Sequence, residues 1–180
     1  MQDQRMYPVE LEGKRVRLRE FRATDEDAVL EIIGDDGVTR WLSFASRDRE
    51  QARAMLAGAM DRAQVEPRDE YYLAVEAAGA EMVGFARLAF AGVRAAKLGY
   101  AVRADAWGNG FATDATRSII DFGFNELKLH RISAAIGPDN EASIAVIKKL
   151  GFQHEGRLRD HVFTNGAWRD SLLYSRLASE

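Results

Sequence analysis

The feature that most constrains this chain is a glycine-bearing turn between a strand-like segment, residues 97–102, and a helix-like one, residues 111–127. The turn reads Trp107-Gly108-Asn109-Gly110-Phe111-Ala112-Thr113. The first amides of a helix lack partners within it, and the helix dipole adds partial positive charge at the same place. Small residues let an anion approach those amides. The turn therefore predicts either a site for a phosphate-bearing ligand or a plain helix start after a tight turn.

Composition narrows the functions that the chain can carry. The net charge of −3 over 180 residues offers no basic field for nucleic acid, so no nucleic-acid partner is expected. With no cysteine, the chain has no disulfide and no thiol nucleophile, and its three histidines lack metal-ligand spacing, so no metal is expected. No apolar run approaches membrane-spanning length. A cytoplasmic protein without membrane contacts is the expectation.

The hydrophobic pattern predicts one domain at residues 13–180, preceded by a leader at residues 1–12. Strands are predicted at 15–19, 71–75, 82–90, 97–102, 130–136, 152–163 and 168–177, with a tight hairpin turn at Asn165-Gly166. Helical periodicity is found around 28–33, 52–60, 111–127 and 141–150, with a short extra turn at 35–40.

Helix starts are predicted from capping residues. Thr24, with Asp27 three residues on, is expected to cap the first helix, and Ser46 or Asp48 the second. The pair Asp139-Asn140 precedes the last helix, and Gly151 is placed to end it.

The order of strands and helices predicts a mixed sheet. Three strands run together between residues 71 and 102 before a long helix follows, which is not the alternation of a doubly wound parallel sheet. The first half of the sheet is therefore expected to be antiparallel. The strand, helix and strand between residues 97 and 136 then imply one right-handed parallel crossover.

Several motifs, in order, resemble the GNAT N-acetyltransferase superfamily, and most closely its RimJ/RimL-type branch, which includes acetyltransferases of ribosomal-protein N-termini. They are Gly99-Tyr100-Ala101-Val102, the turn Trp107 to Thr113, Asn140-Glu141-Ala142-Ser143, Lys149-Leu150-Gly151-Phe152, Glu155-Gly156-Arg157-Leu158-Arg159 and Asn165-Gly166-Ala167-Trp168-Arg169-Asp170. The resemblance covers nearly the whole chain and is densest after Lys97. It implies an α+β GNAT fold: a mostly antiparallel, splayed sheet of about seven strands with one parallel crossover, flanked by about four helices.

The resemblance also implies an acetyl-CoA site. The pyrophosphate would rest on the amides of residues 108–113, that is Gly108, Asn109, Gly110, Phe111, Ala112 and Thr113. Trp107 stands where the superfamily usually has Gln or Arg, so a packing role is expected for it and binding would not depend on a charge. Pantetheine would pair with the open backbone edge of Tyr100, Ala101 and Val102, where this strand splays from the next.

By the same resemblance, Asn140 would hydrogen-bond the pantetheine arm and Ser143 would lie near the sulfur. Each residue also has a simpler interpretation, because Asn140 can cap a helix and Ser143 can be an exposed serine of its second turn. Both residues match the family pattern together with the turn, and we therefore predict catalytic roles for Asn140 and Ser143.

Acetyl transfer needs a neutral amine, a stabilised thioester oxygen and a proton for the departing thiolate. The Val102 amide is the candidate for the oxygen and Ser143 for the proton. Two departures leave gaps: Ile147 stands where many superfamily members have a tyrosine acid, and Lys97 where many of this branch have a glutamate. The base is therefore open, with Tyr72, Glu76, His161 and a water chain as candidates.

Function is predicted as transfer of an acetyl group from acetyl-CoA to a primary amine, either of a small molecule or of a protein N-terminus. The apolar segment 41–44 is either a plug over the core or a substrate wall, and Trp41, Phe44 and Tyr72 are the predicted substrate contacts. A non-catalytic acyl-CoA sensor and a nucleotide-binding protein remain alternatives, although the turn lacks the Lys-Ser/Thr pair of a Walker loop. A homodimer is possible.

Overall fold

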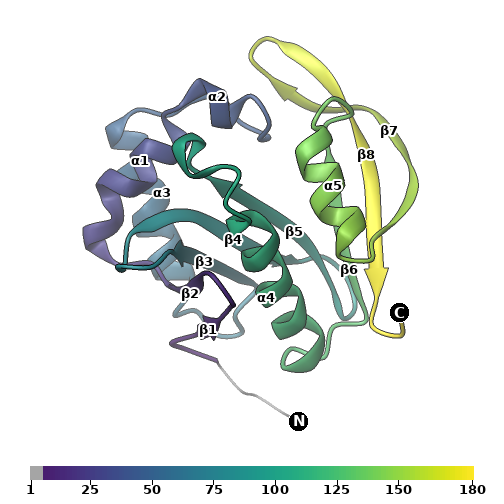
Figure 1. Cartoon of the computed structure of the whole chain (residues 1–180), viewed down its shortest axis with the longest axis horizontal. Coiled ribbons are helices and arrows are strands. Elements are labelled where there is room, and N and C mark those ends of the chain that lie inside the picture. Colours follow the sequence, from purple (N-terminus) through teal and green to yellow (C-terminus); the bar gives the residue numbers. More distant parts are fainter. Residues whose placement is uncertain (1–5) are drawn as a thin grey trace.

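The computed structural model describes residues 6–180. This part of the chain forms eight strands, five α-helices and two short 3-10 helices (Figure 1). The strands are β1 (Glu10–Glu12), β2 (Arg17–Glu20), β3 (Glu70–Glu76), β4 (Met82–Phe90), β5 (Ala95–Val102), β6 (Arg131–Ile136), β7 (Gln153–Thr164) and β8 (Ala167–Leu177). The helices are α1 (Glu26–Ile33), α2 (Asp36–Thr39), α3 (Arg49–Arg62), α4 (Phe111–Asn125) and α5 (Glu141–Lys149), with η1 (Ala23–Asp25) and η2 (Ala104–Ala106).

All eight strands join one sheet in the order β1-β2-β3-β4-β5-β6-β8-β7. Every neighbouring pair is antiparallel except β5 and β6, which are parallel. The pairing of β5 with β6 covers only Ala95–Lys97, whereas β5 pairs with β4 along Ala96–Val102. The predicted mixed sheet, the single crossover and the splay of β5 from β6 are confirmed, and the splay begins after Lys97.

The sheet has a core on each face. One core lies under α4 and α5 and includes Leu88, Ile119 and Ile132, all fully buried. The other lies under α1, α2 and α3 and includes Val29 and Ile32. Figure 1 shows α5 beside β6 and β8, with the long β7–β8 hairpin rising past it and the first three helices on the opposite side. The splay of β5 from β6 opens between these two groups of elements.

The N-terminal part differs from prediction in two ways. The sheet has eight strands where about seven were expected, because β1 lies within the segment taken as a leader. The proposed Thr24 cap is wrong. Asp25 stands at the helix boundary, and its carboxylate accepts a hydrogen bond from the Arg22 amide at 2.7 Å and pairs with Arg19 at 2.8 Å.

The other predicted caps are confirmed. Asp48 accepts a hydrogen bond from the Gln51 amide at 2.9 Å and forms a capping box at the start of α3. Asn140 caps α5, and Gly151 follows that helix in the left-handed region with φ of 83°. Local sequence chemistry thus places both ends of α5, the helix that stands beside the open edge of β5.

Candidate active site

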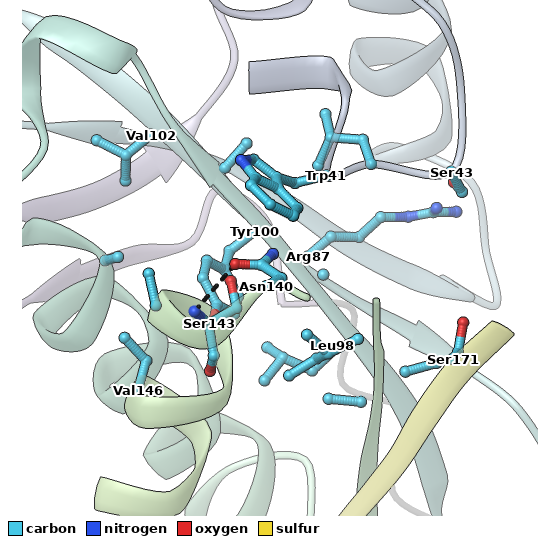
Figure 2. Close-up of a pocket in the computed structure, with 18 of the residues that line it drawn as sticks. Trp41, Ser43, Arg87, Leu98, Tyr100, Val102, Asn140, Ser143, Val146 and Ser171 are labelled. Atoms are coloured by element: carbon cyan, nitrogen blue, oxygen red, sulfur yellow. Dashed lines mark hydrogen bonds between the residues drawn. The ribbon is translucent and has the colours of Figure 1, made fainter. Parts of the chain in front are cut away.

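A cavity of about 1170 Å³ lies at the splay between β5 and β6. The turn before α4 and the start of α5 form one end of it, and segment 41–44, β4, β7 and β8 form the other (Figure 2). Of the predicted site residues, all but Asn109 line this cavity. The lining members are Trp41, Phe44, Tyr72, Tyr100, Ala101, Val102, Trp107, Gly108, Gly110, Phe111, Ala112, Thr113, Asn140 and Ser143. Tertiary folding therefore brings together segments that are up to 102 positions apart, from Trp41 to Ser143.

The turn before α4 has the geometry of an anion cradle. Gly108 and Gly110 have φ of 79° and 76°, a region that glycine enters without steric cost, and Gly110 is the N-cap of α4. The side chain of Asn109 donates to the Ala106 carbonyl at 3.0 Å, and the Asn109 carbonyl accepts from Arg15 at 3.2 Å. Asn109 therefore holds the turn in shape.

Trp107 ties the turn to β5. Its indole N–H donates to the Val102 carbonyl at 2.8 Å, while half of the side chain stays exposed. The expected packing role is thus supplemented by a directed hydrogen bond, which no sequence signal indicated. This bond fixes the distance between the cradle and the end of the splayed strand.

The open edge of β5 presents peptide groups to the cavity. The Arg103 N–H donates to the Val83 carbonyl of β4 at 2.7 Å, and the Ala101 carbonyl also faces β4, against Gly84. Because peptide groups of a strand alternate in direction, those of Tyr100 and Val102 face away from β4, toward the splay. Beyond Lys97 no pairing with β6 uses them. An extended ligand can therefore pair with this edge as an added strand.

The start of α5 lies across the splay from this edge. The Asn140 side chain accepts a hydrogen bond from the Ser143 amide at 3.2 Å, as drawn in Figure 2, so its capping role is real. Its Oδ1 atom caps α5, and the side chain still lines the cavity. The Tyr100 hydroxyl lies 3.5 Å from the Ser143 carbonyl, a contact that sequence reasoning missed because it used only the Tyr100 backbone. Burial raises the Tyr100 pKa, which keeps this phenol neutral.

Aromatic side chains form the wall of the other end. Tyr72 packs edge-on between Phe21 and Phe85, with ring centroids 5.2 and 5.3 Å apart. Leu42 and Phe44 are partly buried against the core under α1–α3 and also line the cavity. The two interpretations of segment 41–44, a plug and a substrate wall, are therefore compatible.

Of the candidates for a base, Tyr72 and Glu76 are poorly suited. Burial strongly raises the Tyr72 pKa, so the phenol is protonated and cannot take a proton. Glu76 is 5% exposed, pairs with the buried Arg19 and does not line the cavity. Its carboxylate belongs to the ion-pair cluster that joins β2 to β3.

His161 lies in the cavity wall because β7 is irregular. Between the pairs Leu158–Ser171 and Val162–Arg169, three residues of β7 oppose one of β8. A bulge of this kind redirects side chains, and such bulges are common beside active sites. The ring Nδ1 of His161 lies 2.9 Å from the buried Ser171 hydroxyl. His161 is one of the residues that line the cavity.

The structure adds lining residues that sequence reasoning missed, above all Arg87 and Arg169. Arg169 donates from its two terminal nitrogens to the carbonyls of Arg40 and Leu42, each at 3.0 Å, and burial lowers its pKa. It links β8 to the aromatic wall across 127 positions of sequence. No local pattern indicates such a contact.

Two further observations concern absences in residues 6–180. No group of three or more His, Asp or Glu side chains is arranged to hold a metal ion. No helix in the same range is long and apolar enough to cross a membrane.

Comparisons with known proteins agree with this architecture. Residues 15–153 match the family described as acetyltransferase (GNAT) domain. The chain is 34% identical over 179 residues to the uncharacterized N-acetyltransferase YoaA of Bacillus subtilis (strain 168), covering 94% of this chain and 97% of that protein. It is 32% identical over 171 residues to the uncharacterized N-acetyltransferase p20 of Bacillus licheniformis, covering 93% and 95%.

Among solved structures, Mycobacterium smegmatis RimJ in complex with CoA-disulfide superposes with a TM-score of 0.85 at 28% identity, over 96% of this chain and 89% of that one. Its similarity confirms the RimJ/RimL-type resemblance. The splayed sheet, the turn before α4 and these matches lead to one conclusion: the chain belongs to the GNAT N-acetyltransferase family.

Proposed function

We propose that this protein transfers an acetyl group directly from acetyl-CoA to a primary amine, of a small molecule or a protein N-terminus. The observation that carries the proposal is the juxtaposition of the turn before α4, the open edge of β5 and the start of α5 around one cavity. That arrangement matches the three parts of acetyl-CoA: an anionic pyrophosphate, an amide-bearing arm and a thioester.

The acyl donor is bound by main-chain groups in this proposal. The amides of residues 108–113 receive the pyrophosphate, helped by the N-terminal dipole of α4. The Tyr100 peptide groups pair with the pantetheine amides, and Asn140 contributes its side-chain amide N–H groups from the other side of the splay. Trp107 keeps cradle and strand in register through its bond to Val102.

The transfer needs no enzyme-bound intermediate. The neutral amine attacks the thioester carbon, the Val102 N–H stabilises the charge that develops on the oxygen, and the C–S bond breaks. Ser143 supplies a proton to the departing sulfur, with the Tyr100 hydroxyl as a second donor beside it. His161, oriented by Ser171, accepts the proton that the amine loses.

An acceptor screen tests the proposal. Purified protein is incubated with acetyl-CoA and a panel of amines, and free thiol is measured. We expect acceptor-dependent thiol release, and a fall in kcat of about 10²-fold in Ser143→Ala, the usual size of a general-acid contribution. Ser118→Ala, on α4 and outside the cavity wall, is the matched control and keeps its activity.

A second candidate function, a non-catalytic acyl-CoA sensor on the same fold, is favoured by two positions. Ile147, where many superfamily members have a tyrosine acid, is fully buried, and Lys97 replaces a glutamate. The sensor predicts tight acetyl-CoA binding by calorimetry, no thiol release with any amine, and no effect of Ser143→Ala. Those three results together would reject the enzyme proposal.

A further inference from the structure

The charges that line the cavity are separated by sign. Its cationic lining residues are Arg87, Lys97, Arg131 and Arg169. Among residues 6–180, the only carboxylates in the lining are Asp139 and Glu141, at the start of α5 where the acyl donor is proposed to bind. The end that receives the acceptor is therefore positively charged, and no acidic side chain there offers a partner to a second ammonium group.

Three of the four cations already have partners within the protein. Arg131 pairs with Glu155 and donates to Ser175 at 3.0 Å, and Arg131 and Ser175 hold the pKa of Glu155 down to about 2. Arg169 donates to two main-chain carbonyls of the aromatic wall. Glu155 therefore neutralises the charge of Arg131, whereas Arg169 pairs with no carboxylate in residues 6–180 and its buried Nε makes no hydrogen bond there.

Arg87 also has a partner, because its Nε donates to Glu70 at 2.6 Å. Glu70 is shared by Arg62 and Arg87, so this three-residue group keeps one net positive charge. Lys97 makes no ion pair in the described part of the chain. The cavity thus contains a positive charge in excess on β4 and another on β5.

The register of the β4–β5 pair places Arg87 and Lys97 beside an open part of the cavity surface. Arg87 lies opposite Gly99 in the β4–β5 pair, and Lys97 lies two residues from Gly99 on the same face. Such diagonal neighbours are about 7–8 Å apart. A Cβ at Gly99 would meet nothing within 4 Å, so the surface of the sheet beside Lys97 is open. A carboxylate fits that space with the Lys97 ammonium as its hydrogen-bond donor, while the Arg87 guanidinium, which is held by Glu70, adds positive charge nearby.

We propose, on the basis of the proposed function, that the acceptor is a small amine that carries its own carboxylate and an apolar body, as a hydrophobic α-amino acid does. The carboxylate binds to Lys97, in the open space beside Gly99. The apolar body packs on Trp41, Phe44 and Tyr72, which line the same end of the cavity (Figure 2 labels Trp41 and Arg87). A polyamine is excluded by like charge.

The same cations help the chemistry. A positive charge near an amine disfavours its protonated form and lowers its pKa. Lys97 cannot act as the base that a glutamate would provide at this position, yet it shifts the bound amine toward the nucleophilic state. The substitution of Lys97 for glutamate is thus consistent with both acceptor binding and deprotonation.

Matched acceptors test the proposal. L-phenylalanine, L-phenylalaninamide and phenethylamine share the ring and a primary amine, and only the first has a carboxylate. Spermidine and a short peptide with a free N-terminus complete the panel, with acetyl-CoA as donor. We expect kcat/KM for L-phenylalanine to exceed that for each of the other four by at least about tenfold, the effect of about 1.4 kcal/mol.

Substitutions of Lys97 test whether this residue causes the preference for the acid. In Lys97→Met the preference for the acid over the amide falls by about tenfold, and the acidic limb of the kcat profile moves to higher pH. Lys97→Glu reverses the preference in favour of spermidine. Lys149→Met, which removes an exposed lysine of α5 outside the cavity wall, leaves the preference unchanged.

The outcomes separate the two proposals. Faster acetylation of phenethylamine, spermidine or the peptide than of L-phenylalanine would overturn the acceptor assignment and leave the acetyltransferase proposal intact. An acid preference that survives in Lys97→Met would overturn the assignment as well. No thiol release with any of the five acceptors would overturn the acetyltransferase proposal, and the acceptor assignment with it.

Discussion

Single residues around the splay act through backbone conformation as much as through side-chain chemistry. Gly108 and Gly110 adopt the left-handed region, and Gly99 leaves the floor of the cavity open. Trp107 and Asn109 use their N–H groups to fix the turn. A site made of main-chain groups tolerates many side chains but few changes of backbone angle.

The Gly110→Val substitution tests the cradle. A β-branched residue at φ of 76° is strained, by about 1–2 kcal/mol or more, and the turn changes shape to relieve that strain. We expect the Kd for acetyl-CoA, measured by calorimetry, to rise at least about tenfold. Gly166→Val, at φ of 75° in the β7–β8 turn, is the matched control with the same strain and an unchanged Kd. Equal affinity in both variants would rule out the cradle.

The His161→Gln substitution tests the proton acceptor. An amide of similar shape can keep the contact with Ser171 but cannot take up a proton at neutral pH. We expect kcat to fall about 10²-fold, the acidic limb of its pH profile to change, and the Kd for acetyl-CoA to stay constant. His154→Gln, on the same strand and packed on Tyr174, serves as control. An unaltered pH profile in His161→Gln would point to a water chain instead.

Buried carboxylates join neighbouring elements through hydrogen bonds. Asp114, in the first turn of α4, is 4% exposed and accepts from the amides of Arg15 at 2.7 Å and Val16 at 3.1 Å. These bonds join α4 to the segment between β1 and β2. Burial alone would raise the Asp114 pKa, but the amides of residues 14–16 outweigh it and the pKa is lowered. The proposed cradle lies at the same helix start, so the position of the cradle depends on this junction.

The Asp114→Asn substitution tests this junction. Because the folded pKa of Asp114 is lowered, its stabilisation is present above the unfolded pKa of about 3.9 and is lost as pH falls through the folded value. We expect Asp114→Asn to lower the free energy of unfolding at pH 7 by about 1–3 kcal/mol in urea titrations. The difference from the unsubstituted protein should shrink below about pH 4. A difference that is constant down to pH 3 would contradict the pKa argument.

The molecule as a whole builds one cavity from its two halves, and Arg169 joins them at the acceptor end. Its guanidinium spans from β8 to the carbonyls of Arg40 and Leu42. The side chain also packs beside Gly137. The wall formed by Trp41 and Phe44 therefore depends on a residue of the last strand.

The Arg169→Met substitution tests this link. Methionine keeps part of the apolar stem but releases both carbonyls, so the wall is no longer held against β8. We expect the KM for the acceptor to rise about tenfold while the Kd for acetyl-CoA stays unchanged. Arg159→Met, an exposed arginine on β7, provides the control. A larger loss of acetyl-CoA affinity than of acceptor affinity would contradict this prediction, because it would mean that Arg169 supports the donor end of the cavity.

Much of the architecture could be predicted because its signals are local. The periods of hydrophobic residues located seven of the eight strands and the four longer helices, and Asp48, Asn140 and Gly151 bounded helices by hydrogen bonds or angles within a few residues. β1 escaped prediction because three residues carry too short a pattern. The segments proposed for the donor end of the candidate site could be located for the same reason, because they are a turn, a strand edge and a helix start.

The acceptor end was decided by contacts between residues far apart in the chain. Glu76 is excluded as a base because folding buries it against Arg19, 57 positions away. His161 faces the cavity because a bulge in β7 turns it inward, and a bulge depends on the register with β8. The sequence by itself determined which segments are strands and helices and where a glycine-bearing turn precedes a helix, because those properties depend on neighbouring residues. Only the tertiary structure decided which charges remain unpaired in the cavity, because pairing depends on distance in space.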